Sequence, residues 1–205
     1  DEHGQKMSKS LGNIYTLEDL QKHGFSLDAF RMLALEKHYQ TEGNFTWEIL
    51  TASQNRLARW KNIASLRWQV NDTLSSDESK DNDHEINGVI LAAGHAAQEA
   101  LANNLDTPGA LMAYERAFQQ IENTHIDHIQ KAAFTQMLEG IDELLGFRLL
   151  KSTPDISDEM KQKIIERRHA RKEKNWAKSD EIRDELKAQG IELEDGKHGT
   201  IWQRA

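Results

Sequence analysis

The stretch Asn104-Leu105-Asp106-Thr107-Pro108 lies between two runs of apolar residues at helical spacing. Thr107 is expected to cap a helix and Pro108 to be its first residue, because a first turn does not need the N–H that proline lacks. A short connection between two long amphipathic helices predicts antiparallel neighbours, and hence a helical bundle. The stripe before the stretch consists of Ile86, Val89, Ile90, Ala93, Ala97, Ala100 and Leu101, and the one after it of Leu111, Tyr114, Phe118 and Ile121.

Further long helices are expected on both sides of this pair. After it, an apolar stripe runs from Ile126 to Leu145 and is stopped by Gly146. Before it, Thr46 is expected to cap a long helix that reaches about Trp68. The tryptophans of that helix are expected to pack in a core, where large aromatic rings supply much of the buried area. They are Trp47, Trp60 and Trp68.

Two shorter helices are predicted near the amino terminus. Thr16 and Asp19 form a capping-box pattern that Gly24 ends, and Ser26 is expected to cap a helix to about Tyr39. Arg31, on the second helix, could pair with a phosphate or a carboxylate or remain solvated. The apolar face expected for that helix consists of Phe30, Leu33 and Ala34, with the stem of Lys37.

Composition limits the classes of protein that this chain can be. Its 205 residues suit one or two domains, and a hydrophobic share of 38% with two prolines suits a soluble, mainly helical protein. A net charge of −8 argues against nucleic-acid binding by the whole surface, so a basic interface must be local. Cysteine is absent from the sequence, which excludes disulfides and thiolate metal sites. No apolar run approaches the ~20 residues of a membrane span, so we expect a cytoplasmic protein without a membrane partner.

Two groups of residues resemble metal ligands by type but not by spacing. Residues 71–85 hold six acidic residues and one lysine, without the glycine-containing spacing of an EF-hand. A solvated connection between helices is expected there. His125 and His128 are three residues apart and lack a complete ligand set by spacing, so we expect ordinary surface histidines. No metal site is predicted.

The last quarter of the chain differs in charge from the rest. Residues 151–155 are expected to form a linker between domains. Residues 161–178 hold eight basic and two acidic residues, within a chain that is acidic overall. Ser157 and Asn175 are expected to cap two helices, the second of which ends at Gly190. This concentration of positive charge is the best candidate for a local nucleic-acid interface.

A short hairpin is predicted after these helices. Residues 191–194 alternate as a strand, Asp195-Gly196 is expected to turn the chain, and residues 200–203 to return as the partner strand. The helices and the hairpin together make a mixed α/β unit of about 50 residues, near the lower limit for independent folding.

The chemistry of this unit suits a single-stranded RNA loop. Its arginines and lysines neutralise phosphates, while Trp176, at the break between the two helices, could stack on an unpaired base. Carboxylates such as those of Asp180 and Asp195 could accept hydrogen bonds from base amino or imino groups. Duplex RNA hides its bases in a deep groove, so a site of this mixed kind predicts binding to a loop such as an anticodon.

The amino-terminal stretch Gln5-Lys6-Met7-Ser8-Lys9-Ser10-Leu11-Gly12-Asn13 alternates lysines with small hydroxyl residues and ends in a glycine. Two ammonium groups on flexible stems can meet a polyphosphate as point charges. Hydroxyls and backbone N–H groups around Gly12 can supply further donors to phosphate oxygens. We call residues 6–13 the signature loop.

Several of these segments resemble a known family. The chain is similar to bacterial cysteinyl-tRNA synthetase, a class I aminoacyl-tRNA synthetase, over nearly its whole length. The resemblance implies a carboxy-terminal part of three regions: a signature loop with a stem-contact segment (1–45), a helical-bundle anticodon-binding domain (46–150) and a small α/β anticodon-recognition domain (151–205). The segments that carry it are Lys6-Met7-Ser8-Lys9-Ser10-Leu11-Gly12-Asn13, Arg31, His38-Tyr39, Asn104-Leu105-Asp106-Thr107-Pro108, Ala170-Arg171, Asn175-Trp176-Ala177, Ser179-Asp180, Gly190-Ile191-Glu192-Leu193-Glu194-Asp195-Gly196 and Gly199-Thr200-Ile201-Trp202.

The resemblance also implies roles for individual residues. Lys9 is expected to contact ATP, with support from Lys6, and the hydroxyls of Ser8 and Ser10 to lie beside the phosphates. Members of the family activate cysteine with ATP and attach it to tRNA(Cys), using a zinc ion to select the cysteine thiolate. No zinc ligand is expected in this chain, which is expected to act as a monomer and to be inactive without a catalytic domain. The residues implied in anticodon recognition are Arg171, Trp176, Asp180 and Asp195.

Two alternatives remain open. The chain could be a stand-alone tRNA-binding module without catalysis, although a pure binding module would not need both Lys6 and Lys9. It could also belong to the paralogous cysteine ligase of mycothiol synthesis, which shares the signature loop. That ligase reads no tRNA and would not need the basic tail with Leu193-Glu194-Asp195-Gly196 and Trp202.

Overall fold

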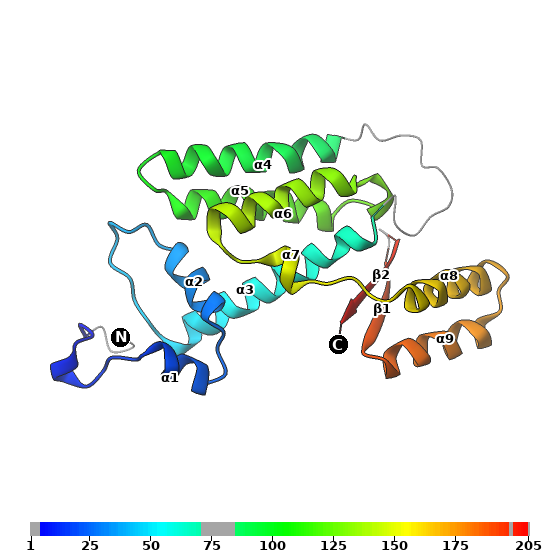
Figure 1. Ribbon diagram of the computed structural model, residues 1–205, viewed down its shortest axis with the longest axis horizontal. Helices are drawn as coiled ribbons and strands as arrows, with labels where there is room; N and C mark the ends of the chain where they lie inside the picture. The colour runs from blue at the N-terminus through cyan, green and yellow to red at the C-terminus, as the bar shows by residue number, and fades with distance from the viewer. Residues whose placement is uncertain (1–4, 71–84, 197–198, 205) are drawn as a thin grey trace.

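The computed structural model describes residues 5–70, 85–196 and 199–204 (Figure 1). Helices make up most of these ranges, and a two-stranded antiparallel sheet closes the chain. The predicted mainly helical fold with a small mixed tail is therefore confirmed. The elements in order are η1 (Lys9–Leu11), α1 (Leu17–Lys22), α2 (Leu27–Leu35), α3 (Trp47–Ser65), η2 (Leu66–Trp68), α4 (Glu85–Ala102), α5 (Thr107–Glu122), η3 (Ile126–His128), α6 (Lys131–Leu145), α7 (Leu149–Ser152), α8 (Asp158–Lys172), α9 (Trp176–Ala188), β1 (Ile191–Gly196) and β2 (Gly199–Arg204).

The bundle is built from α3, α4, α5 and α6, which share one large hydrophobic core. Figure 1 shows α4, α5 and α6 running side by side above α3. Trp60 is fully buried at the centre, with ring centroids 5.0 Å from Phe118 and 5.7 Å from Phe147. The expectation of a tryptophan core thus holds for Trp60. The rings of Trp47 and Trp68 are half-buried, and Trp68 packs against the core of the tail.

Helix α5, which follows the connection from α4, begins one residue earlier than a Thr107 cap would allow. Asp106 is the N-cap, and its carboxylate accepts a hydrogen bond from the Gly109 N–H at 2.9 Å. Thr107 is already helical, so Pro108 occupies the second helical position and the expectation for Thr107 was wrong. The carboxylate outcompetes the hydroxyl because it is the stronger acceptor for a first-turn N–H.

The short helix α2 differs from prediction in its length and its buried face. It ends at Leu35, not near Tyr39, and the residues that it buries are Ala29, Met32 and Leu33. Phe30 and Ala34, expected inside, are exposed. The stripe read from the sequence was displaced because α2 packs between two clusters, one that contains Met32 and another that contains Ala29 and Leu33.

The predicted helix from Ile126 to Leu145 is interrupted. A short 3-10 turn, η3, is followed by extended backbone at Ile129 before α6 begins at Lys131. Asn87, buried on α4, accepts a hydrogen bond from the Gln130 N–H at 2.9 Å and donates one to the His128 carbonyl at 3.3 Å. These bonds replace helical ones, so the interruption is stabilised from a distant part of the chain.

The tail, formed by α8, α9, β1 and β2, packs around its own small core. Ile164, Leu186 and Ile191 are buried there with Trp202, which is 1% exposed. Strands β1 and β2 pair in register, with Leu193 opposite Trp202 and Asp195 opposite Thr200. The predicted hairpin is confirmed, but Asp195-Gly196 is not its turn. Both residues lie within β1, and Gly196 is paired with Gly199, while residues 197–198 lie outside the described residues.

Residues 151–155, predicted to be a linker, are partly helical and partly buried. Lys151 and Ser152 belong to α7, and Thr153 is 7% exposed. The buried guanidinium of Arg67 donates to the Thr153 carbonyl at 2.7 Å and to the Leu150 carbonyl at 2.9 Å. The connection is therefore anchored to the end of α3, because those backbone carbonyls satisfy a buried cation.

Two other expectations meet the structure only in part. The acidic connection predicted at residues 71–85 falls outside the described residues, except for Glu85 at the start of α4. Within the described ranges, no helix combines the length and the apolar character needed to cross a membrane.

Candidate nucleic-acid interface

Helix α8 carries most of the basic residues of the tail, and half of the basic residues of 161–178 are paired internally. Lys161 lies 2.5 Å from Asp155, and Lys163 lies 2.7 Å from Glu185. The hydrogen bond that Lys161 donates to the Asp155 carboxylate raises the pKa of Lys161. Arg167 and Arg171 bind Asp195. The other four basic residues form no ion pair with any described residue. They are Arg168, Lys172, Lys174 and Lys178.

Asp195 is the centre of a network with Arg167, Arg171 and Thr200, here called the tail network. Arg167 donates two hydrogen bonds to the Asp195 carboxylate, at 3.1 and 2.7 Å. Arg171 donates to Oδ2 at 2.8 Å, and the Thr200 hydroxyl donates to Oδ1 at 2.7 Å. The bonds from Arg167, followed by that from Thr200, lower the pKa of Asp195 to about 2. The two oxygens thus accept four hydrogen bonds, about the capacity of a carboxylate.

Arg171 links this network to the surface. Its side chain is 39% exposed, and only one of its five N–H donors is engaged by Asp195 in the structure. Its guanidinium carbon lies 5.9 Å from the ring centroid of Trp176. Four donors and one face of the cation therefore remain for a ligand beside an aromatic ring.

Trp176 is exposed because of the tight turn between α8 and α9. Lys174 adopts a left-handed conformation with φ of 58°, and the Asn175 N–H donates to the Ala170 carbonyl at 2.8 Å. Asn175 then caps α9 by accepting from the Lys178 N–H at 3.2 Å. These local bonds leave the Trp176 ring 56% exposed at the start of α9. The structure thus has an accessible stacking surface at the predicted position.

Asp180 follows Trp176 by four residues on α9, so the two side chains lie on one face of the helix. The Asp180 carboxylate is 63% exposed, and its nearest cation is Arg183, at 3.7 Å. Asp180 therefore keeps free acceptor capacity, unlike Asp195. Of the four predicted anticodon residues, the structure joins Arg171, Trp176 and Asp195 directly and places Asp180 one helical turn further on.

Sequence reasoning missed two members of the tail network. Arg167 is 2% exposed and lies four residues before Arg171, so it shares a face of α8. Thr200 is the cross-strand partner of Asp195. The spacing of the two arginines was a usable signal, whereas the pairing of Thr200 required the hairpin register.

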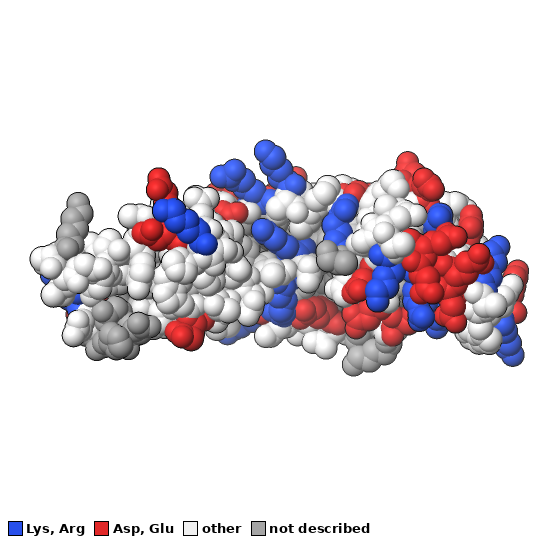
Figure 2. Space-filling view, turned by 90° about the horizontal axis from the view of Figure 1, so that it is seen from below, with Lys and Arg blue, Asp and Glu red and all other residues white. Residues whose placement is uncertain are grey.

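The charge of the tail is separated between its elements. Figure 2, which views the molecule from below, shows acidic side chains gathered over this end of the molecule. The acidic residues of α9 and β1 are exposed or half-buried, whereas the unpaired cations lie on α8, at the turn before α9 and, as Lys178, in the first turn of α9. An RNA backbone is therefore expected to follow α8 and the turn and to avoid α9 beyond Asp180. Apart from Asp195, the acidic residues of α9 and β1 are Asp180, Glu181, Asp184, Glu185, Glu192 and Glu194.

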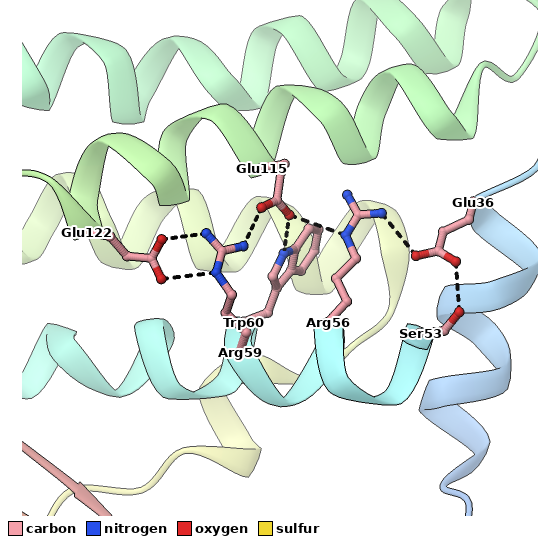
Figure 3. Close-up of polar contacts among 7 residues, drawn as sticks. All are labelled: Glu36, Ser53, Arg56, Arg59, Trp60, Glu115 and Glu122. Carbon is pink, nitrogen blue, oxygen red and sulfur yellow. Dashed lines mark hydrogen bonds and ion pairs between the residues drawn. The ribbon is translucent and has the colours of Figure 1, made fainter. Parts of the chain in front are cut away.

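A second charged cluster, the bundle network, joins α3 to α2 and α5 (Figure 3). The Glu115 carboxylate accepts from the Trp60 indole N–H at 2.9 Å and from Arg56 at 3.3 Å, and it also binds Arg59. Burial raises the pKa of Glu115, but the hydrogen bonds from Trp60 and Arg59 outweigh it and lower the pKa overall. The full set is Glu36, Arg56, Arg59, Glu115 and Glu122.

The signature loop lies at the end of the molecule opposite the tail (Figure 1). The Asn13 side chain closes it, accepting from the Ser8 N–H at 2.9 Å and donating to the Lys6 carbonyl at 3.2 Å. The hydroxyls of Ser8 and Ser10 lie 3.1 Å apart, and the backbone of Lys9 begins η1. The structure thus gathers the predicted loop residues on one compact turn, away from the tail network.

No group of three or more His, Cys, Asp or Glu in the described residues is arranged to hold a metal ion. His125 and His128 have ring centroids 5.7 Å apart, and His125 caps η3. With no cysteine in the chain, its residues do not fit the zinc site that the resemblance implies for the family.

Comparison with known proteins identifies the family. Residues 153–202 match the family described as the cysteinyl-tRNA ligase anticodon binding domain. The chain is 36% identical over 204 residues to a protein of Chlamydia caviae named cysteine–tRNA ligase, and 32% identical over 208 residues to one of that name from Leptospira interrogans. The two alignments cover 96% and 98% of this chain, but 41% and 43% of the relatives. The chain thus spans about two fifths of the length of these relatives, and it belongs to the cysteine–tRNA ligase family.

Proposed function

We propose that this chain supplies the tRNA-binding part of a cysteine–tRNA ligase and that its tail reads the anticodon loop of tRNA(Cys). The observation that carries the proposal is the exposed Trp176 ring beside Arg171, whose position is fixed by Asp195. A stacking surface next to a cation suits an unpaired base followed by its phosphate. The match of residues 153–202 to an anticodon-binding family supports the same role.

The four residues have different roles in the proposal. Trp176 stacks on a base, and Arg171 donates to a phosphate or a base edge with its unengaged N–H groups. Asp180 keeps free acceptors, so it discriminates a base by its amino or imino hydrogens. Asp195 acts through Arg171, because its own oxygens already accept four hydrogen bonds. It is a positioning residue that contributes to recognition without occupying a base edge.

The signature loop is assigned to the ATP site of the longer ligase. Lys6 and Lys9 supply positive charge there, and the hydroxyls of Ser8 and Ser10 supply donors to phosphate oxygens. ATP supplies the group that activates the cysteine carboxylate. The cysteine site and the zinc site are assigned to the part of the ligase outside this chain. The ligase is proposed to act as a monomer in the cytoplasm.

Binding of the chain to two RNAs tests the anticodon assignment. We would measure dissociation constants for tRNA with a cysteine anticodon and for the same tRNA with that anticodon replaced, across a salt series. A preference for the cysteine anticodon that persists as salt is raised is expected, because base contacts are less salt-dependent than phosphate contacts. Equal affinity for both, with the tail folded, would reduce the site to a nonspecific basic surface.

Catalysis tests the assignment of the remaining chemistry to the longer protein. The chain alone is expected to show background ATP–pyrophosphate exchange with cysteine. Exchange clearly above a blank that contains no protein would contradict this, and would mean that the chain holds an ATP site and a cysteine site of its own.

A further inference from the structure

A basic cleft lies at the junction between the bundle and the tail. It has a volume of about 270 Å³ and lies between η3 of the bundle and α8 and β2 of the tail. Its polar lining consists of His125, Asp127, Arg168, Arg171, Lys172 and Thr200. Arg171, already assigned to the anticodon site, therefore also lines a second cavity on the side of the bundle.

The charges in this cleft favour an anion. Three cations, Arg168, Arg171 and Lys172, meet one carboxylate, Asp127, which is exposed at its edge. Asp195 also faces Arg171, but its charge is already shared with the buried Arg167. Neither Arg168 nor Lys172 has an ion-pair partner among the described residues, so their positive charge is available to a ligand.

His125 supplies a donor from the side of the bundle. Its Nδ1 accepts a hydrogen bond from the Asp127 N–H at 3.3 Å, as the cap of η3. The same nitrogen lies 3.4 Å from the Asp127 carboxylate. In the neutral tautomer that lets Nδ1 accept, and also in the charged ring, Nε2 carries a hydrogen. In both forms Nε2 can donate to an oxygen held in the cleft.

The two sides of the cleft are held together by backbone and side-chain bonds. The Gln69 amide donates to the Trp202 carbonyl at 2.9 Å and accepts from the Trp202 N–H at 2.6 Å. The Trp68 indole donates to the Thr153 carbonyl at 2.9 Å. Both tryptophans belong to or border the core of the tail, so the cleft is preformed and loses little freedom on binding.

We propose that this cleft holds one phosphate of the RNA backbone, gripped by Arg168, Arg171 and Lys172 from the tail and by His125 from the bundle. The inference rests on the proposed function, because it takes the RNA bound at Trp176 as the source of the phosphate. It adds that the strand leaves the tail across the junction, so that one phosphate contacts both parts of the molecule. The relative position of bundle and tail then contributes to RNA affinity.

The experiment pairs protein variants with neutralised phosphates. The probe is an anticodon stem-loop RNA with the cysteine anticodon, prepared as a series with one methylphosphonate at each loop position in turn. The 205-residue chain is compared with Lys172→Gln, from the tail side, and His125→Asn, from the bundle side. Asparagine keeps a cap acceptor for η3 but lacks the Nε2 donor. Lys187→Gln removes the same charge from the far end of α9, outside the cleft, and serves as the control.

We expect the effects of the protein variants and of the methylphosphonate to be non-additive at one loop position of the RNA only. Lys172→Gln should weaken binding of the unmodified RNA about fivefold, the scale of one charge contact, while Lys187→Gln leaves it unchanged. At one methylphosphonate position, Lys172→Gln and His125→Asn should have no further effect. The slope of log K against log salt should fall by about 0.7 for the lost contact.

The outcomes separate this inference from the proposed function. If both variants weaken binding equally at every methylphosphonate position, the cleft holds no phosphate and the inference is overturned, even when the chain still prefers the cysteine anticodon. If the chain shows no such preference but the non-additive position is found, the cleft binds RNA and the anticodon assignment fails. Melting curves of both variants, one on each side of the junction, identify a loss of affinity that is due only to unfolding.

Discussion

The bundle network joins two guanidinium groups to three carboxylates, whereas the tail network joins two guanidinium groups to one carboxylate. In the bundle, both oxygens of Glu115 and the donors of Arg56 and Arg59 are directed at one another across α3 and α5 (Figure 3). In the tail, Asp195 is saturated while Arg171 keeps four unengaged donors at the surface.

The comparison indicates how the sign of the excess charge in a network decides whether the network can bind an anion. A network in which carboxylates outnumber cations has nothing to offer an RNA phosphate, so its value lies in packing α3 against α5. A network with one cation to spare can fix that cation through the carboxylate and still direct its remaining donors outward. The difference predicts that changes in the bundle network alter stability, and that changes in the tail alter binding.

The largest effect is expected from Glu115→Ala in the bundle network. The side chain of Glu115 is 15% exposed, and its loss leaves Arg56, Arg59 and the Trp60 indole without their shared acceptor. The free energy of unfolding should fall by about 3 kcal/mol, as when one partner of a buried pair is removed. Urea unfolding measures the change.

Glu122→Gln is the control for that experiment. Glu122 is 38% exposed and pairs only with Arg59, so its removal should cost less than about 1 kcal/mol. Equal losses for Glu115→Ala and Glu122→Gln would mean that the network is a set of independent surface pairs. RNA affinity of the folded protein should be unchanged in both variants.

The second effect in size is expected from Arg167→Met in the tail network. The Arg167 side chain is 2% exposed and donates two of the four hydrogen bonds that the Asp195 carboxylate accepts. Methionine keeps much of the volume, but stability should fall by about 2 kcal/mol because Asp195 loses its main partner. RNA affinity should fall as well, since Arg171 is then bound by a carboxylate that is no longer fixed.

A double variant distinguishes this role from simple packing. Adding Asp195→Asn to Arg167→Met removes the uncompensated carboxylate and should recover part of the stability, but not the RNA affinity. If the double variant recovers both, Asp195 does not position Arg171. Unfolding curves and binding to the cysteine-anticodon tRNA are measured on the same preparations.

Local signals accounted for what the sequence predicted well. Ser26, Thr46, Ser157 and Asn175 all cap helices as expected, because a cap needs only a side chain and an N–H two or three residues away. Trp176 was expected at an exposed break between helices, and its exposure follows from the same local bonds. These features required no knowledge of tertiary contacts.

The features that the sequence did not predict depend on residues that are far apart along the chain. The break before α6 is set by Asn87, which is 43 residues away from Gln130 in the sequence. The saturation of Asp195 is set by Arg167, 28 residues before it, so a residue predicted to contact a base turned out to have its acceptors occupied. Spacing identifies residue types at a site, but it cannot say which of them bind one another.

The third prediction concerns the stacking residue. Trp176→Ala should weaken binding to tRNA by about 1–2 kcal/mol, the scale of one base stacked on an aromatic ring. The melting temperature should stay unchanged, because the ring is 56% exposed and makes no core contact in the tail cluster. A fall in stability with unchanged affinity per folded molecule would assign Trp176 to packing.

Acid should weaken the tail network in a measurable way. The pKa of Asp195 is lowered from 3.8 to about 2 by its hydrogen bonds to Arg167 and Thr200, so the folded state binds its proton later than the unfolded state. Its contribution to stability is present above pH 4 and is lost as the pH falls through about 2. The stability difference between the wild type and Asp195→Asn should therefore shrink from pH 5 to pH 2. A difference that is constant over that range would show that the charge of Asp195 is not what stabilises the tail.

The smallest effect is expected from Lys163→Gln, which tests whether all basic residues of α8 contribute equally. Lys163 is part of the basic segment, but its ammonium lies 2.7 Å from Glu185, at the surface of the tail, where the two side chains are 24% and 47% exposed. Its loss should leave the free energy of unfolding nearly unchanged, as for an ion pair at the surface. RNA affinity should not change at all, because the charge of Lys163 already faces Glu185 and not the cleft. Lys172→Gln is the matched comparison: the same substitution on the same helix, at a lysine that lines the cleft. If Lys163→Gln weakens RNA binding as much as Lys172→Gln, the RNA responds only to the total charge of α8, and the separation of paired from unpaired cations is wrong.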